Sequence, residues 1–239
     1  MMRARRNTLI AAVAVALLLI VATFPMRLAL GWSGAGDAGV AARAVRGSIW
    51  SGELVDARLG AIPLGTVEAS LSPLALLLGQ TELAFSRSDE RLGALTGRLH
   101  GSSPRGISNV DGVTTLAGGL GPIPVDTVRF EGATIRFGAD GRCVEASGRL
   151  QLMVAAPIAG LDLSRGLSGP LRCAGGRAQA ALASQSGMER LTLSFDGQGA
   201  YRAQFAINVD DDPAMAAALA AFGFQSGPGG FALTTNGRF

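Results

Sequence analysis

The residues able to carry out catalysis are few in this chain of 239 residues. His100 is the only histidine, and no G-x-S-x-G turn accompanies it, as the nucleophile of a hydrolase would require. The acidic residues are mostly scattered singly, so their spacing does not indicate the paired carboxylates of general acid and base catalysis. We therefore expect that the protein is not an enzyme and takes no cofactor and no small-molecule substrate.

Two short motifs resemble ligand sites but have simpler explanations. A G-x-G-x-x-G pattern at Gly34, Gly36 and Gly39 would need a preceding strand to bind a dinucleotide, and none is indicated there. The run Asp210–Asp212 could hold a hard cation, but its last residue directly precedes a helix pattern and is explained as an N-cap. One histidine and two cysteines cannot complete a zinc site. No metal site is expected.

The two cysteines, Cys143 and Cys173, are the remaining reactive residues. Neither belongs to a C-x-x-C motif, so we favour a disulfide between them, provided that the compartment is oxidising. Closing a loop of about thirty residues would stabilise the fold by roughly 3–4 kcal/mol. Two free, buried thiols are the alternative.

The N-terminal segment predicts that compartment. Residues 7–26 carry no charge, and as a helix they would span about 30 Å, the thickness of a bilayer core. Three arginines precede this stretch and Arg27 follows it, so residues 1–6 are expected in the cytoplasm and the body on the far side. A cleaved signal peptide is the alternative, but it would have a shorter apolar run and a small-x-small site after it.

The distribution of charge excludes nucleic acid as a partner. All 21 basic residues are arginines against 18 acidic residues, which gives a net charge of +3. Without residues 1–30 the body has 17 arginines and 18 acids, a net charge of −1, too little positive charge for binding by counterion release. With 48% hydrophobic and 16% charged residues, the composition favours a packed domain over disorder.

The body that must position these residues has the pattern of a β-sheet. After an expected flexible linker over 27–44, short period-two runs alternate with Gly, Pro, Asn and Asp through a periplasmic domain over 45–239. The predicted strand segments are 53–59, 65–71, 92–99, 128–130 with 133–137, 144–154, 190–195, 201–209 and 231–239. We expect a mainly β fold: a curved, mostly antiparallel sheet forming an open groove, half-barrel or sandwich.

Two or three short helices are expected to interrupt the sheet. The clearest begins at Pro213 after an aspartate, continues through an alanine-rich run and ends at Gly223. A second, apolar one lies between Pro73 and Gly79, and the segment 113–120 is a weaker third.

Two motifs in the first third of the body resemble those of a known family. Gly47, Trp50 and Gly52 form a G-x-hydrophobic-W-x-G segment, and Pro73 and Gly79 bound a P-x-A-L-L-x-G segment that contains Leu76. Together with the N-terminal anchor, the late alanine-rich helix and the terminal strand, they make the chain resemble the type II secretion system protein N family.

This resemblance implies a single-pass inner-membrane subunit of the Gram-negative machine that moves folded periplasmic proteins across the outer membrane. Its implied role is assembly or scaffolding with other inner-membrane and periplasmic subunits. The six motif residues have either structural or interaction roles, with the glycines bending the chain around a buried Trp50 and Pro73 ending a strand. The alternative function is a membrane-anchored groove that binds lipid or another apolar ligand.

Overall fold

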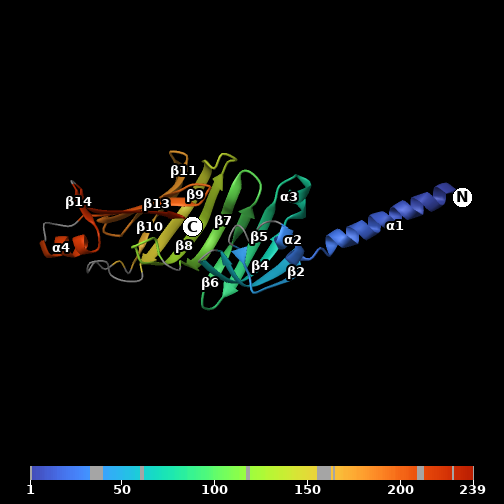
Figure 1. Cartoon of the computed structure of the whole chain (residues 1–239), viewed down its shortest axis with the longest axis horizontal. Helices are drawn as coiled ribbons and strands as arrows, with labels where there is room; N and C mark the ends of the chain where they lie inside the picture. Colours follow the sequence, from blue (N-terminus) through green and yellow to red (C-terminus); the bar gives the residue numbers. More distant parts are fainter. Residues whose placement is uncertain are drawn as a thin grey trace.

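The computed structural model describes residues 2–32, 40–59, 62–116, 119–154, 163, 165–208, 213–227 and 229–238. A helix, α1 (Met2–Ala22), projects from one end of a long curved sheet, and the chain ends near the middle of the view (Figure 1). The other elements are α2 (Met26–Trp32), β1 (Val40–Ala41), β2 (Ala44–Ser48), β3 (Ser51–Leu59), β4 (Ile62–Leu71), α3 (Pro73–Leu77), β5 (Glu82–Asp89), β6 (Gly93–His100), β7 (Arg105–Thr115), β8 (Val125–Phe137), β9 (Cys143–Val154), β10 (Leu167–Ala174), β11 (Arg177–Ala183), β12 (Glu189–Phe195), β13 (Ala200–Ile207), α4 (Pro213–Ala221), β14 (Gln225–Gly227) and β15 (Gly230–Arg238).

The strands form a single antiparallel meander. From β3 to β13 each strand pairs with the next along the chain, and β15 then pairs with β13 and carries β14 on its other side. At the opposite end, β1 and β2 both pair with β3. Short connections between sequential antiparallel strands explain why most neighbours in sequence are neighbours in the sheet.

The inner face of the second half of the sheet is packed. Six of its large inward side chains on β9 to β13 are at most 2% exposed, namely Leu152, Leu167, Leu182, Leu191, Phe205 and Ile207. Further buried side chains cover that layer from the loops and from α4, namely Leu120, Ile123, Leu163, Leu219 and Phe224. This half of the domain therefore has a filled core, while Arg149 and Arg172 on its strands are exposed to solvent.

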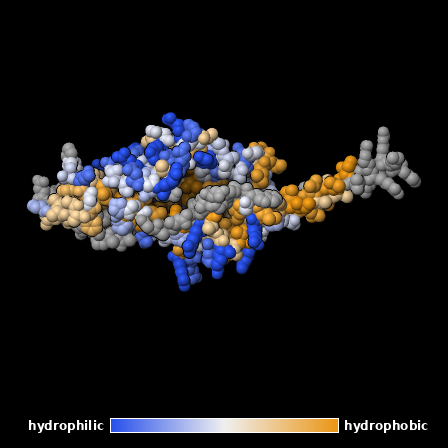
Figure 2. All heavy atoms as spheres, in the orientation of Figure 1, coloured by the Kyte–Doolittle hydropathy of each residue, from blue (hydrophilic) through white to orange (hydrophobic). Residues whose placement is uncertain are grey.

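The N-terminal helix lies outside this core. Its large apolar side chains are exposed, as in Ile10, Val15 and Leu19 at 59%, 56% and 60%, and Figure 2 shows the apolar colour along it. Within the described part of the chain, none of the helices combines the length and the apolar content needed to cross a bilayer.

Most of the predicted elements are confirmed. The predicted strand segments overlap β3, β4, β6, β8, β9, β12, β13 and β15, with Val209 and Phe239 outside the described residues. The helix after Pro213 is α4, and Gly223 with φ +89° ends it. The predicted N-cap run Asp210–Asp212 and the glycines 34, 36 and 39 lie outside the described residues.

Other expectations need correction. The segment 113–120 is not a helix: its β-branched residues 113–115 end β7, and Leu120 bridges to Ile123. The expected linker over 27–44 contains most of α2, the whole of β1 and the first residue of β2. Strands β5, β7, β10 and β11 were not predicted; β10 contains Pro170, and β11 is alanine-rich, so strand pairing overrides weak local propensity.

Candidate functional site

The sole histidine does not complete a catalytic triad. Nε2 of His100, at the end of β6, lies 2.7 Å from Oγ of Ser108 on β7. Burial lowers the pKa of His100, and the nearby Arg136 lowers it further. No acid hydrogen-bonds the ring in the described part of the chain, so the group that orients the base of a triad is missing there. The described residues also bring together no cluster of three or more metal-binding side chains.

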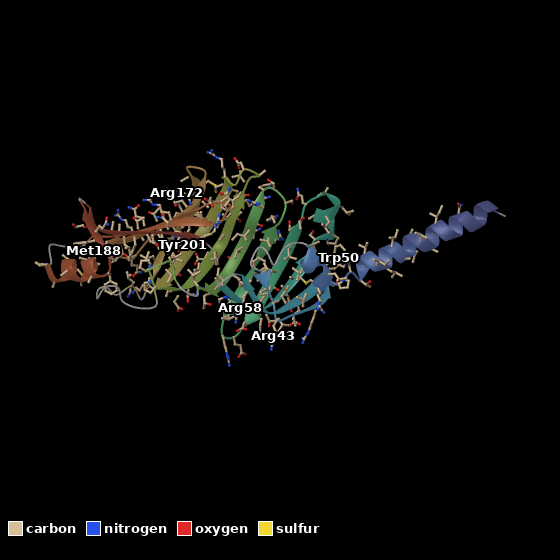
Figure 3. The ribbon with its side chains drawn as sticks, viewed as in Figure 1. Arg43, Trp50, Arg58, Arg172, Met188 and Tyr201 are labelled. Carbon is tan, nitrogen blue, oxygen red and sulfur yellow. A yellow bond between two sulfur atoms is a disulfide. The ribbon has the colours of Figure 1, made fainter. Side chains whose placement is uncertain are left out.

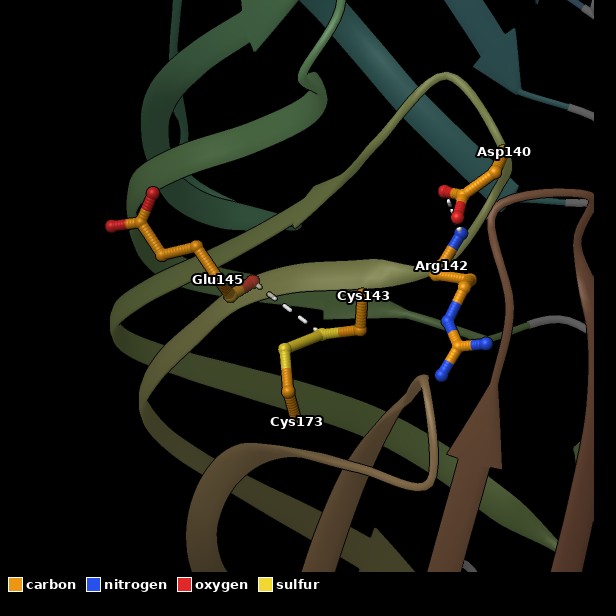
Figure 4. Close-up of a disulfide and its surroundings, with 5 residues drawn as sticks. All are labelled: Asp140, Arg142, Cys143, Glu145 and Cys173. Carbon is orange, nitrogen blue, oxygen red and sulfur yellow. Dashed lines mark hydrogen bonds between the residues drawn. A yellow bond between two sulfur atoms is a disulfide. The ribbon is translucent and has the colours of Figure 1, made fainter.

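The two cysteines form the predicted disulfide, with their Cα atoms 5.6 Å apart (Figure 4). Cys143 begins β9 and Cys173 lies near the end of β10. The paired part of these strands stops at Arg149 and Pro170, so the disulfide joins them beyond the end of their backbone ladder. It is a structural link, and the alternative of two free thiols is wrong.

The first family motif forms the hairpin between β2 and β3. Gly47 has φ +81°, and a Cβ there would collide with the carbonyl oxygen of Ser51. A Cβ at Gly52 would collide with Sδ of Met26, the first residue of α2, which is 3% exposed. The two glycines therefore permit a tight turn and a close approach of α2 to the hairpin.

Trp50, at the tip of this hairpin, contacts the end of α1. Its indole Nε1 donates a 2.8 Å hydrogen bond to the backbone oxygen of Val21 (Figure 3). The prediction that Trp50 is a buried aromatic needs correction, because the side chain is only half-buried. It lies against the helix end rather than within the sheet's core, and the oxygen of Val21 also accepts a 3.3 Å hydrogen bond from the N–H of Phe24.

The second family motif forms α3 and its two ends. Ser72 caps the helix by accepting a 3.3 Å hydrogen bond from the backbone N–H of Ala75, and Pro73 occupies the first turn. Gly79, with φ +72°, ends it, and its N–H donates to the carbonyl oxygen of Leu76 at 2.9 Å. Leu76 is 38% exposed.

The fold brings these two motifs to the same end of the sheet. The N–H of Ile49 donates to the oxygen of Phe24 at 3.0 Å, and the N–H of Leu71 donates to the oxygen of Ile49 at 2.8 Å. This short ladder connects the end of α1, the Trp50 hairpin and the start of α3. The two motif segments therefore lie at the end of the sheet from which α1 projects.

A depression of about 610 Å³ lies beside the hairpin. Its lining includes the two motif glycines and Ala69, together with Glu53 and Glu68. Arg46 and Ser86 already contact these acids, Arg46 with Glu53 at 3.6 Å and Ser86 with Glu68 at 3.4 Å. Both acids at this depression therefore already have a partner.

Sequence reasoning missed the exposed leucines around Leu76. Leu74, Leu77 and Leu78 are 69%, 84% and 71% exposed. The sequence shows an uncharged, leucine-rich run between Pro73 and Gly79, and this run by itself predicts only a short helix. Exposure of its side chains depends on how the neighbouring strands pair, which local spacing does not specify.

One comparison with known proteins identifies a relationship. The family model described as type II secretion system (T2SS), protein N, matches residues 38–234. No curated protein and no solved structure matches the chain.

Proposed function

Because the chain belongs to the type II secretion system protein N family, we propose that it is an accessory inner-membrane subunit of that machinery. In this role it assembles or scaffolds other subunits for the export of folded periplasmic proteins. The observation that carries the proposal is the family match, which extends over residues 38–234 and so includes nearly all of the sheet.

The proposed location is the inner membrane, with the sheet in the periplasm. Support comes from the uncharged stretch 7–26 and the arginines on either side of it, which favour a signal anchor with residues 1–6 in the cytoplasm. The hydrogen bond from Trp50 to Val21 would then couple the anchor directly to the domain over 45–239.

We propose that other subunits bind at the open edge of the sheet, along β15. β14 pairs only with residues 230–232 of β15, and the described residues place no strand beside Leu233–Arg238 on that side. Free backbone donors and acceptors on an edge strand can pair with a strand of another chain. The alternative of an apolar-ligand groove gains no support, because Leu120, Ile123 and Leu219 cover the inner face of the second half.

Deletion of the gene tests the secretion role. We expect type II substrates to accumulate in the periplasm in their folded, active form and secretion to return when the full chain is supplied on a plasmid. A resident periplasmic protein, which does not use this route, serves as the control for general export. Unchanged secretion under several growth conditions would contradict a required role.

A further inference from the structure

The connection between β4 and β5 exposes an apolar surface that the sheet does not cover. We call residues 73–79 the leucine turn. Three of its leucines, Leu74, Leu77 and Leu78, are more than two-thirds exposed, while Ala75 at 8% is the residue that packs inward. The chain carries no charge from residue 69 to residue 81. Figure 2 shows this apolar patch at the place that α3 occupies in Figure 1.

The leucine turn has a defined backbone conformation. Ser72 caps its first turn, and two hydrogen bonds close its end, from the N–H of Gly79 to Leu76 at 2.9 Å and from the N–H of Gln80 to Ala75 at 2.8 Å. The turn is also flanked by paired strands, since Leu71 pairs with Leu83. The leucines are therefore presented outward by a capped helix.

The position of the leucine turn relative to α1 suggests what covers it. The hydrogen bonds from Leu71 to Ile49 and from Ile49 to Phe24 place Leu71, two residues before the turn, two chain spacings from Phe24, which lies two residues after the end of α1. At roughly 4.8 Å per spacing, this separation is about 10 Å. Trp50, whose Nε1 donates a hydrogen bond to the oxygen of Val21, also lies at the end of α1. A lipid surface crossed by α1 would thus pass close to the leucines.

We propose that the leucine turn inserts into the headgroup and acyl boundary of the leaflet from which α1 emerges. The occupant of this apolar surface is the lipid bilayer, and the proposal rests on the membrane anchoring proposed above for α1. Uncharged apolar side chains bury at this boundary, and a half-exposed tryptophan such as Trp50 is typical of the same depth. Two contacts with the bilayer, the anchor and the leucine turn, hold the sheet in a fixed orientation, which a single helix would not.

Fluorescence quenching in lipid nanodiscs tests this docking on the full chain. Because both native cysteines are in the disulfide, a single introduced cysteine can be labelled selectively with an environment-sensitive dye. The labelled sites are Val15→Cys in α1, Leu77→Cys in the leucine turn and Met188→Cys at the end of the sheet opposite α1 (Figure 3). The nanodiscs contain phosphatidylethanolamine and phosphatidylglycerol, with or without brominated acyl chains as quenchers.

We expect brominated lipid to reduce the emission at positions 15 and 77 by roughly twofold or more and to leave position 188 unchanged. Quenching at 15 without quenching at 77 would overturn the docking and leave the anchor intact. No quenching at 15 would overturn the anchor and, with it, the proposal. Equal quenching at 77 and 188 would show a sheet lying flat on the lipid, which also contradicts docking through this turn.

A charge variant separates lipid contact from general proximity. Leu74→Asp combined with Leu78→Asp, in the Leu77→Cys background, should abolish quenching at 77 because carboxylates resist transfer out of water. Quenching at 15 should be unchanged in this variant, measured with the same pair of substitutions in the Val15→Cys background. Both leucines are exposed, so the fold is preserved, as thermal melts can verify. Persistent quenching at 77 would overturn the proposal, as would a cross-link from the turn to a protein in cells with no lipid quenching.

Discussion

Among single residues, Arg87 has the most unusual environment in the sheet. It points from β5 into the apolar layer and is 2% exposed. Nε donates to the oxygen of Gly93 at 3.0 Å, Nη1 to that of Leu64 at 3.1 Å, and Nη2 to those of Leu92 at 2.9 Å and Val113. One side chain therefore joins β4, the turn between β5 and β6, and β7. Burial lowers the pKa of this guanidinium, and the nearby carboxylate of Asp89 opposes the shift.

Replacing Arg87 should destabilise the fold strongly. Arg87→Met removes the side-chain donor from four partly buried carbonyl oxygens, and we expect the free energy of unfolding to fall by about 3 kcal/mol. Arg98→Met is the matched control, because Arg98 is exposed and its ion pair with Glu82, at 3.5 Å, contributes less than about 1 kcal/mol. Urea denaturation followed by circular dichroism measures both. Equal losses in the two variants would show that the buried hydrogen bonds do not stabilise the fold.

The lowered pKa of His100 makes stability depend on pH. Its pKa lies below the 6.5 of an unperturbed histidine, so the unfolded chain binds more protons in this range. The contribution of His100 is therefore fully present above pH 6.5 and decreases as the pH falls through its folded pKa. We expect the urea midpoint of the wild type to fall more steeply from pH 7.5 to 5 than that of His100→Asn, in which carboxylate titration is retained. Parallel profiles would contradict this.

The long strand pair β8–β9 and the strand pair β10–β11 diverge, and the disulfide bridges them. Residues 143–147 of β9 pair only with β8, and residues 171–174 of β10 pair only with β11. The N–H of Cys143 donates to the oxygen of Gly176 at 2.8 Å, which is one further link across the gap. Because the pairing between β9 and β10 stops at Arg149 and Pro170, the disulfide holds the two strands together beyond that pair.

Removing the disulfide should therefore destabilise this part of the sheet. For Cys143→Ala combined with Cys173→Ala we expect a loss of about 3 kcal/mol in the free energy of unfolding, as for a loop of about thirty residues. Hydrogen exchange should rise first at the start of β9. A reducing agent should lower the stability of the wild type by a similar amount and leave the double variant unchanged. A wild type insensitive to reduction would contradict the prediction.

The whole molecule is a long, open sheet with one end at α1 and the other at α4 (Figure 1). A meander of this kind keeps neighbouring strands close in sequence, and its two edges remain available for pairing. The edge at β1 and β2 lies beside the exit of α1, whereas Leu233–Arg238 of β15 lie at the other edge. The proposed anchor at one end and the edge at Leu233–Arg238 are consistent with the proposed role of connecting other subunits.

Photo-cross-linking in intact cells tests the use of that edge. A photoreactive residue replacing Thr234, exposed on β15, should cross-link to another secretion subunit more strongly than one replacing Arg129, which is exposed on β8 and pairs with both neighbouring strands. The reason is that, among the described residues, Leu233–Arg238 have no strand beside them on one side and can hold a partner strand there, whereas Arg129 is paired on both sides. Equal cross-linking at the two positions, or none at Thr234 in secreting cells, would contradict edge pairing.

Period-two patterning and turn residues were sufficient to predict a mainly β domain, and the helix after Pro213 followed from its local capping residues. The pairing of Cys143 with Cys173 was also predictable, because the chain has no other cysteine. These features depend on residues close in sequence or on composition. The meeting of Trp50 with Val21, the burial of Arg87 and the exposure of the leucine turn depend on which strands pair and in which register. Those contacts join residues that are distant in sequence, so tertiary packing alone could specify them.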